Sequence, residues 1–212
     1  MKGGATWAGQ ADGDGRAERG DSWTGLRTAR RAVVQASLAF LDREAGAEAV
    51  ERVLAAMAPE DREALLREEA EEVELDPVFR LWRAMDRELE HRGGWMERAG
   101  AFSIESTGRD QYGGIVGKTS PLEFLTQRIS LFRLYYRCGR MEVVRHGEGE
   151  AVLRLVDFGP SDPLFCARQT GGLQRALALA QGGEPRVRHV RCVHEDDAFC
   201  EWRLKWGAPQ SV

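Results

Sequence analysis

Hydrophobic residues in the first half of the chain recur every three to four positions, the spacing of one face of an α-helix. Such stripes cover residues 32–41 and 49–57. Residues 59–61 and 76–77 place proline and acidic residues where helices begin. The pattern predicts an all-helical N-terminal layer, in which we interpret the acidic run at residues 68–74 as a solvated helix face.

The middle of the chain contains one segment that is hard to assign and one clear helix. Residues 95–116 have helical spacing, but several glycines interrupt it, and such glycines mark close backbone approach or bends. In residues 120–136, Ser120 is placed to cap the helix, with Pro121 and Glu123 at its first and third positions. Apolar residues cover much of this long helix, so other elements must pack on several of its sides.

From residue 141 the hydrophobic period changes to two, which is typical of strands. Residues 141–145 and 151–158 alternate around a glycine-containing turn, residues 164–180 return to helical spacing, and residues 187–193 and 199–206 form a second hairpin. We therefore predict an α+β fold: an N-terminal helical layer, then a four-stranded antiparallel sheet made of two hairpins. The long helix and a crossover helix would pack on that sheet.

The predicted domain organisation is simple. Residues 1–22 contain too little apolar surface to offset the entropy of ordering, so we expect a disordered leader. Residues 23–206 would form a single α+β domain, with a helical part at 23–92 and a ligand-binding-like part at 93–206. Residues 207–212 would be a tail.

Charge and composition narrow the partners and the compartment. The net charge is −4, and arginines are interleaved with acidic residues, which argues against nucleic acid or a membrane surface as a partner. No apolar run approaches the ~20 residues needed to span a bilayer, and no secretory signal is present. We expect a cytoplasmic protein, in which the four cysteines are ligands or buried thiols rather than disulfides.

Four residues near the end of the chain suggest a metal site. Cys192 and Cys200 flank the acidic turn at residues 195–197, His189 lies three residues before Cys192, and Cys166 lies near the start of the crossover helix. Three thiolates and one imidazole form a closed four-coordinate set, which is typical of structural zinc. The alternative is that these cysteines are small buried side chains of strand and helix.

The terminal hairpin also carries a family resemblance. Cys192, the acidic turn, Cys200 and residues 201–206 resemble the end of vinyl-4-reductase-type domains. That superfamily includes aromatic-sensing domains of phenol- and xylene-responsive activators, a Golgi transport subunit and the haem-nitric oxide sensors. Over residues 26–206 the chain is most similar to a myxobacterial family of unknown function, through residues 49–54, 59–62 and 135–143.

The resemblance implies the same ligand set. In the aromatic-sensing relatives, zinc is held by a cysteine at a helix start, an acidic residue, and two further cysteines. These positions correspond to Cys166, His189, Cys192 and Cys200, with His189 replacing a carboxylate. Imidazole is an equally competent ligand, and His194 is the alternative fourth ligand.

The resemblance argues against haem as a cofactor and leaves structural zinc as the expectation. Haem-sensing relatives bind iron through a histidine in the helix that corresponds to residues 120–136, and this chain has no histidine there. Their Tyr-x-Ser-x-Arg clamp on the propionates, expected near residues 154–158, is also missing.

The relatives hold their ligands in an apolar cavity between the long helix and the sheet. The alternative for this chain is that side chains fill the space between the long helix and the sheet and leave no cavity. The aromatic and methionine side chains that would line such a cavity are Phe102, Tyr112, Phe124, Phe132, Tyr135, Tyr136, Met141 and Phe165.

These observations favour a zinc-stabilised small-molecule-binding or sensory domain that acts through a protein partner or a homodimer. Its ligand would be a small apolar molecule. Catalysis is not expected: the glycines of residues 113–119 do not have phosphate-loop spacing, and no histidine lies beside a candidate nucleophile. The alternatives are an interaction scaffold with a filled core and, with less support, an enzyme or accessory factor for a tetrapyrrole or aromatic compound.

Overall fold

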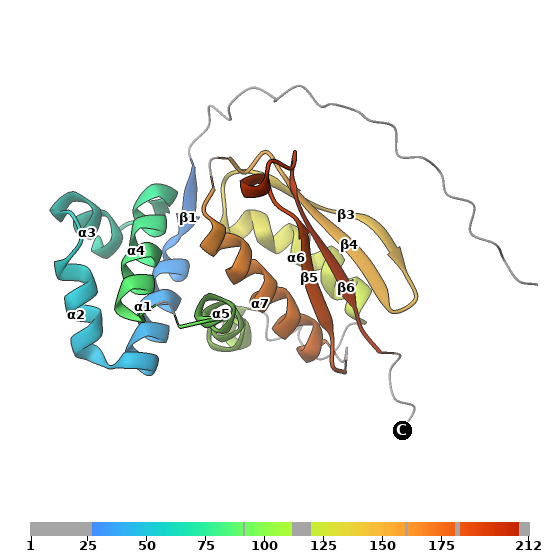
Figure 1. Cartoon of the computed structure of the whole chain (residues 1–212), viewed down its shortest axis with the longest axis horizontal. Coiled ribbons are helices and arrows are strands. Elements are labelled where there is room, and N and C mark those ends of the chain that lie inside the picture. Colours follow the sequence, from blue (N-terminus) through green and yellow to red (C-terminus); the bar gives the residue numbers. More distant parts are fainter. Residues whose placement is uncertain (1–26, 91, 112–119, 160, 181–182, 208–212) are drawn as a thin grey trace, which may run out of the picture.

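The computed structural model describes residues 27–90, 92–111, 120–159, 161–180 and 183–207 (Figure 1). The predicted leader, residues 1–22, and Tyr112 lie outside these residues. The elements in chain order are β1 (Thr28–Arg30), α1 (Arg31–Ala45), α2 (Ala47–Ala55), α3 (Pro59–Leu66), β2 (Glu72–Glu74), α4 (Leu75–Glu88), α5 (Trp95–Gln111), α6 (Pro121–Tyr135), β3 (Arg140–Gly147), β4 (Glu150–Val156), α7 (Pro163–Leu179), β5 (Arg186–Arg191), the 3-10 helix η1 (Val193–Glu195) and β6 (Cys200–Lys205).

Helices α1 to α4 form the N-terminal layer, at the left of Figure 1, and a short two-stranded sheet accompanies them. The interpretation of residues 68–74 as a helix face is wrong, because the end of this run is strand β2, paired antiparallel with β1. Glu72 accepts hydrogen bonds from Thr28 Oγ1 at 2.6 Å and Arg137 Nε at 2.7 Å. The acidic run therefore joins the helical layer to the residues that follow α6.

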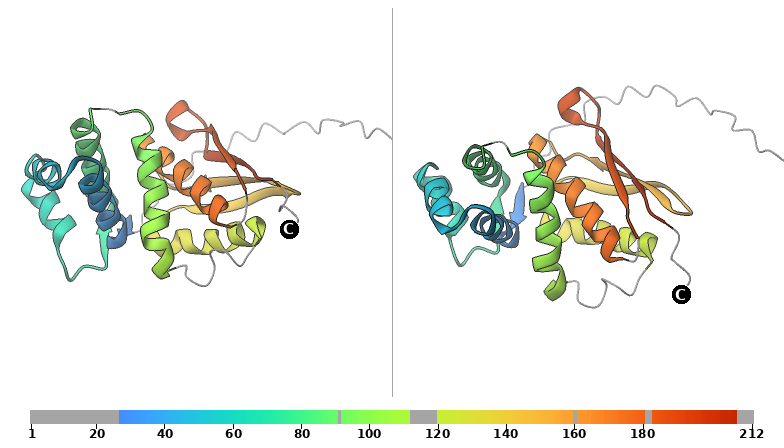
Figure 2. Two further views of the ribbon diagram at one scale, coloured as in Figure 1. Left: turned by 90° about the horizontal axis from the view of Figure 1, so that it is seen from below. Right: turned by 60° about the horizontal axis from the view of Figure 1, so that its bottom comes forward.

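Helix α5 is continuous through Gly100, so the glycines do not break it in the way the sequence suggested. Gly100 and Gly171 instead allow the backbones of α5 and α7 to touch where the two helices cross (Figure 2). A Cβ atom built on Gly171 would overlap the carbonyl oxygen of Glu97, and one built on Gly100 would overlap that of Arg168. Close backbone approach, one of the two roles expected of such glycines, is the role that Gly100 has.

Helix α6 begins as predicted. Ser120 accepts a hydrogen bond from the Glu123 amide, the Glu123 side chain accepts one from the Ser120 amide, and Pro121 occupies the first turn. Strands β3 to β6 form an antiparallel sheet in the order β3-β4-β6-β5, with α6 and α7 on one of its sides (Figures 1 and 2). The predicted α+β fold is confirmed.

The main hydrophobic cluster contains residues of the N-terminal helices, of α6 and α7, and of the sheet. Trp82 of α4 and Trp202 of β6 are both fully buried members of it. Among the described helices, none is long and apolar enough to cross a membrane.

Candidate metal centre and ligand cavity

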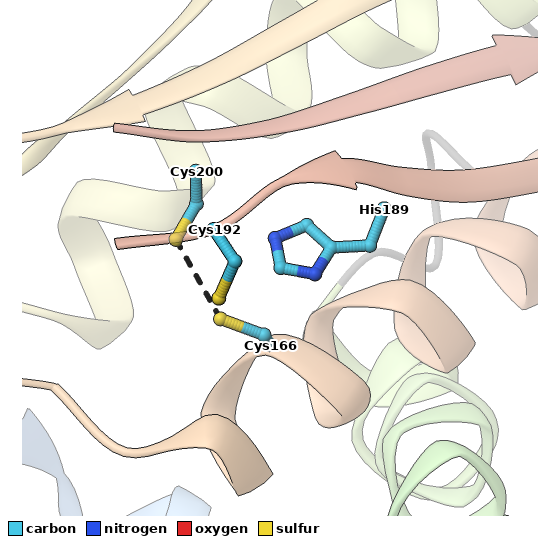
Figure 3. A group of neighbouring side chains, drawn as sticks. All are labelled: Cys166, His189, Cys192 and Cys200. Atoms are coloured by element: carbon cyan, nitrogen blue, oxygen red, sulfur yellow. Dashed lines mark hydrogen bonds between the residues drawn. The ribbon is translucent and has the colours of Figure 1, made fainter. Parts of the chain in front are cut away.

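The start of α7 fixes the position of Cys166. Asp162 caps the helix by accepting a hydrogen bond from the Leu164 amide at 2.9 Å, and Pro163 occupies the first turn. Arg83 of α4 donates a hydrogen bond to Asp162 at 2.6 Å. Cys166 lies one turn later, where its buried side chain points toward the sheet (Figure 3).

His189 reaches the same point because strand β5 contains a β-bulge. Residues three apart in a regular strand lie on opposite faces, so His189 and Cys192 would not meet. The β5–β6 register shifts between His189 and Arg191, which inserts an extra residue, Val190, and redirects the chain. His189 therefore faces α7, and Cys192, just after the strand, turns inward as well.

The acidic turn positions the two cysteines of the second hairpin. Asp197 Oδ2 accepts a hydrogen bond from the Cys192 amide at 2.8 Å, and the Cys192 carbonyl accepts bonds from the Glu195 and Asp197 amides. Asp196 adopts the left-handed conformation, with φ of 64°. The turn therefore returns the chain to Cys200, the first residue of β6.

The four predicted ligands converge. One ligand atom from each of Cys166, His189, Cys192 and Cys200 lies within 4.8 Å of all the others (Figure 3). The Cys166 and Cys200 sulfurs are 3.6 Å apart. Two sulfurs of a tetrahedral site with metal–sulfur bonds of about 2.3 Å lie about 3.8 Å apart, whereas a disulfide requires about 2.05 Å. The Cys166–Cys200 separation is therefore close to that of two metal-bound sulfurs and too long for a disulfide, and all four cysteines are free thiols.

The electrostatics of the cluster favour one thiolate. The contact with the Cys166 thiol lowers the pKa of Cys200 to about 4, and the His189 imidazole acts in the same direction. The same contact with Cys200, together with burial, raises the pKa of Cys166. Burial also raises the pKa of Cys192.

Neighbouring side chains fix the orientation of the residues in the cluster. The Trp202 ring stacks on His189 at 4.7 Å between centroids, and its Nε1 donates to Thr170 Oγ1 at 2.9 Å. Thr170 donates in turn to the Cys166 carbonyl. Nε2 of His189 is buried without a hydrogen-bond partner. Such outer contacts fix the orientation of metal ligands, and the sequence interpretation missed both Trp202 and Thr170.

The two remaining thiol and imidazole candidates lie outside the cluster. His194 Nε2 is 2.9 Å from Ser161 Oγ, so the alternative fourth ligand is engaged with the loop before α7. Cys138 is buried elsewhere in the core, and burial raises its pKa to about 11.

Some of the predicted pocket residues meet and others do not. Phe132, Tyr136 and Phe165 pack together around Phe158, with the Phe158 and Phe165 rings 4.2 Å apart. Met141 is buried in the same hydrophobic cluster, and Tyr135 packs against that cluster. Phe102 instead contacts Phe40 of α1, Phe124 belongs to a separate small cluster, and Tyr112 lies outside the described residues.

A small cavity remains between α1, α5, α6 and α7. Its volume is about 40 Å³, and Phe132, Tyr135 and Tyr136 line it together with Gln169. Gln169 is 4% exposed, and its Oε1 atom has no hydrogen-bond partner. Because most buried polar atoms in folded proteins are hydrogen-bonded, this acceptor marks a place where a hydrogen-bond donor fits.

A larger open groove, of about 810 Å³, lies along α5 and α7 near the start of β5. Its arginines include Arg98 and Arg175, which already form ion pairs with Glu44 at 3.7 Å and Glu105 at 2.7 Å.

Comparison with known proteins identifies the fold. No family model and no curated protein matches the sequence. Among solved structures, the Fe(II) unliganded H-NOX protein from K. algicida matches with a TM-score of 0.67 and 10% identity, covering 86% of this chain and 99% of that one. The S. oneidensis H-NOX protein in its Fe(II)NO state matches with a TM-score of 0.63 and 14% identity, covering 84% and 99%.

A third match is a mutant form of T. tengcongensis H-NOX, with a TM-score of 0.64, 14% identity, and coverage of 86% and 100%. These neighbours are haem-nitric oxide/oxygen binding domains, consistent with the haem-sensor part of the predicted resemblance. At 10–14% sequence identity, these matches show a shared fold and nothing further.

The cofactor expectation of structural zinc without haem is contradicted by these neighbours. One matching structure, with a TM-score of 0.63, is described as probing haem distortion in the H-NOX family, so the fold is one that houses haem. Helix α6 of this chain has no histidine, but tyrosine, cysteine and methionine also ligate haem iron. Tyr136, Cys138 and Met141 lie buried around the end of α6. The chain has the H-NOX fold, with a cysteine–histidine cluster joining its sheet to α7.

Proposed function

We propose that this chain is a sensory ligand-binding domain whose output passes through a protein partner. The observation that carries the proposal is the unpaired Gln169 Oε1 atom, which is buried beside a cavity between four helices. An unsatisfied acceptor costs stability, and sites that cost stability are typical of function. The H-NOX fold supports the same class of activity, since its solved members include a protein with bound NO.

The ligand would enlarge the cavity as it binds. A volume of about 40 Å³ is close to the ~30 Å³ occupied by one molecule of liquid water, so a larger ligand must displace the rings of Phe132, Tyr135 or Tyr136. Apolar atoms form the larger part of the walls, and the polar side chains among them are Ser103, Tyr135, Tyr136, Arg168 and Gln169. Gln169 offers the unpaired acceptor. We therefore propose a mainly apolar small molecule that carries one hydrogen-bond donor.

The cysteine–histidine cluster would support this site. We propose that Cys166, His189, Cys192 and Cys200 hold a soft divalent metal ion that ties the second hairpin to α7. The distances, the depressed pKa of Cys200 and the unpaired His189 nitrogen support this assignment. Because α7 also carries Gln169, such a metal would fix one wall of the cavity. The cysteine pattern likewise supports kinship with the aromatic-sensing relatives.

Replacing Gln169 with leucine is expected to lower ligand affinity about fivefold while leaving stability unchanged or higher. The variant removes the hydrogen bond to the ligand, worth about 1 kcal/mol, and it also removes an unpaired buried acceptor from the free protein. The protein is purified from the cells that make it. Native mass spectrometry then measures the fraction of chains that carry a small molecule, and an absorption spectrum would reveal haem by its Soret band.

Gln174→Leu is the matched control for this experiment, because Gln174 is exposed on the same helix. It should keep the wild-type occupancy. Wild-type protein that carries no small molecule under native conditions would contradict the proposal. That result would favour the alternative of a scaffold with a filled core, which the ring contacts around Phe158 support.

A further inference from the structure

The side of the sheet that faces away from α6 and α7 is strongly basic, although the whole chain is acidic. No described helix or strand covers this side (Figures 1 and 2), which we call the outer face. Strand alternation places side chains from all four strands on it. Its exposed basic residues are Arg140, Arg145, Arg186, Arg188, Arg191, Arg203 and Lys205.

The basic residues form rows across the strands. Arg145 pairs in register with Val152, Val152 with Arg203, and Arg203 with Arg188. In the next row Lys205 lies opposite Arg186. Like charges directly opposite one another destabilise a strand pair. The Arg203–Arg188 and Lys205–Arg186 pairs therefore lower the stability of the sheet.

The acidic residues of the outer face do not neutralise these rows. Glu142 pairs with Arg140 at 2.5 Å and Glu201 pairs with Arg154 at 2.9 Å. At this end of the sheet, Glu150 lies opposite Lys205 and lines the hollow, and the exposed Glu148 and Glu184 lie in the adjoining turns. The surplus positive charge is thus concentrated on β5, β6 and Arg145.

A hollow lies within the basic rows. It has a volume of about 190 Å³, and Arg145, His146, Arg203 and Lys205 line it together with Glu150 and the buried Val152. This volume is several times the ~30 Å³ occupied by one molecule of liquid water. A carboxylate side chain fits there between two guanidinium groups, which bind carboxylates with two parallel hydrogen bonds.

We propose that the outer face is the docking surface for an acidic segment of a partner protein, with one carboxylate in the hollow. Charge complementarity favours this occupant. A second copy related by a two-fold axis would place the basic face against itself, and the net charge of −4 repels a nucleic acid at longer range. The inference rests on the proposed function, which assigns the output to a protein partner.

The test uses the full chain and a fluorescent poly-L-glutamate peptide, with binding followed by anisotropy. The triple variant Arg145→Glu, Arg188→Glu, Arg203→Glu is expected to weaken binding at least about tenfold, since truncating or reversing interfacial charges lowers affinity. The matched control is Arg62→Glu, Arg87→Glu, Arg92→Glu, which changes the net charge equally on exposed arginines of the N-terminal half. The control should weaken binding less than about twofold.

Further measurements keep the outcomes separate. The single variant Arg188→Glu places opposite charges across β5 and β6, so its melting temperature should stay equal or rise while its affinity falls; a fall in both would indicate a structural role. Equal losses in the two triple variants, no binding by the wild type, or tighter binding of a DNA strand of the same charge would overturn the proposal. The Gln169→Leu protein should bind the peptide as tightly as the wild type. Failure of the proposed ligand site can therefore be told apart from failure of the proposed docking surface.

Discussion

Replacing Cys192 and Cys200 together with serine is expected to abolish metal binding and lower the melting temperature by roughly 10 °C. The two sulfurs come from the two ends of the acidic turn, and together with His189 they face Cys166 of α7. Serine is a poor ligand, so the hairpin would lose its tie to the helix. Mutations that remove a structural metal lower the free energy of unfolding by about 4 kcal/mol or more. At this chain length each kcal/mol corresponds to about 2–4 °C in melting temperature.

Metal analysis of the purified protein, followed by thermal melting, measures both effects. The wild type should carry about one metal ion per chain, and cobalt added to metal-free protein should give a thiolate-to-cobalt absorption band. Cys138→Ser is the control, because Cys138 is buried but outside the cluster; it should keep the full metal content. The assignment would be contradicted by wild-type protein that contains no metal, or by a double variant whose melting temperature equals that of the wild type.

Replacing Gly171 with alanine is expected to destabilise the fold by about 3 kcal/mol, or roughly 6–12 °C in melting temperature. Elsewhere in a helix this change stabilises by up to about 1 kcal/mol, because alanine is the better helix former. Here the new methyl group would overlap the carbonyl oxygen of Glu97, which is backbone and cannot rotate away. Helices α5 and α7 would therefore have to separate.

Gly93→Ala is the control for the crossing, since a methyl group at Gly93 meets no atom within 4 Å. Its melting temperature should change by less than about 2 °C, in line with surface substitutions. A Gly171→Ala protein as stable as the wild type would show that the helices can move apart without cost, which contradicts the close backbone contact.

The sequence predicted the elements with strong local signals. The cap at Ser120, the glycine-containing turn before β4 and the two hairpins depend on neighbouring residues, and each lies where expected. Strands β1 and β2 were missed because three residues are too few to show a period. The acidic run before α4 was misread because the strand with which it pairs lies more than forty positions earlier in the chain.

The residues that form the cluster were predictable, but the geometry that brings them together was not. Residue spacing and family resemblance indicated Cys166, His189, Cys192 and Cys200, whereas the bulge at Val190 that brings His189 and Cys192 to one side has no sequence signature here. The outer face was missed because its basic residues alternate with buried ones on separate strands. They gather only when the four strands pair, so the even mixture of charges along the chain concealed them.

The crossing of α5 and α7 also determines how a signal can travel. Where side chains separate two helices, rotamer changes can absorb a small displacement, but at Gly100 and Gly171 backbone meets backbone and nothing compressible intervenes. If α7 shifts when a ligand binds, α5 would have to move with it. Helix α1 of the N-terminal layer contacts α5 and would be displaced in turn. The two glycines thus couple α7 to α5 rigidly, so a displacement of one helix would move the other.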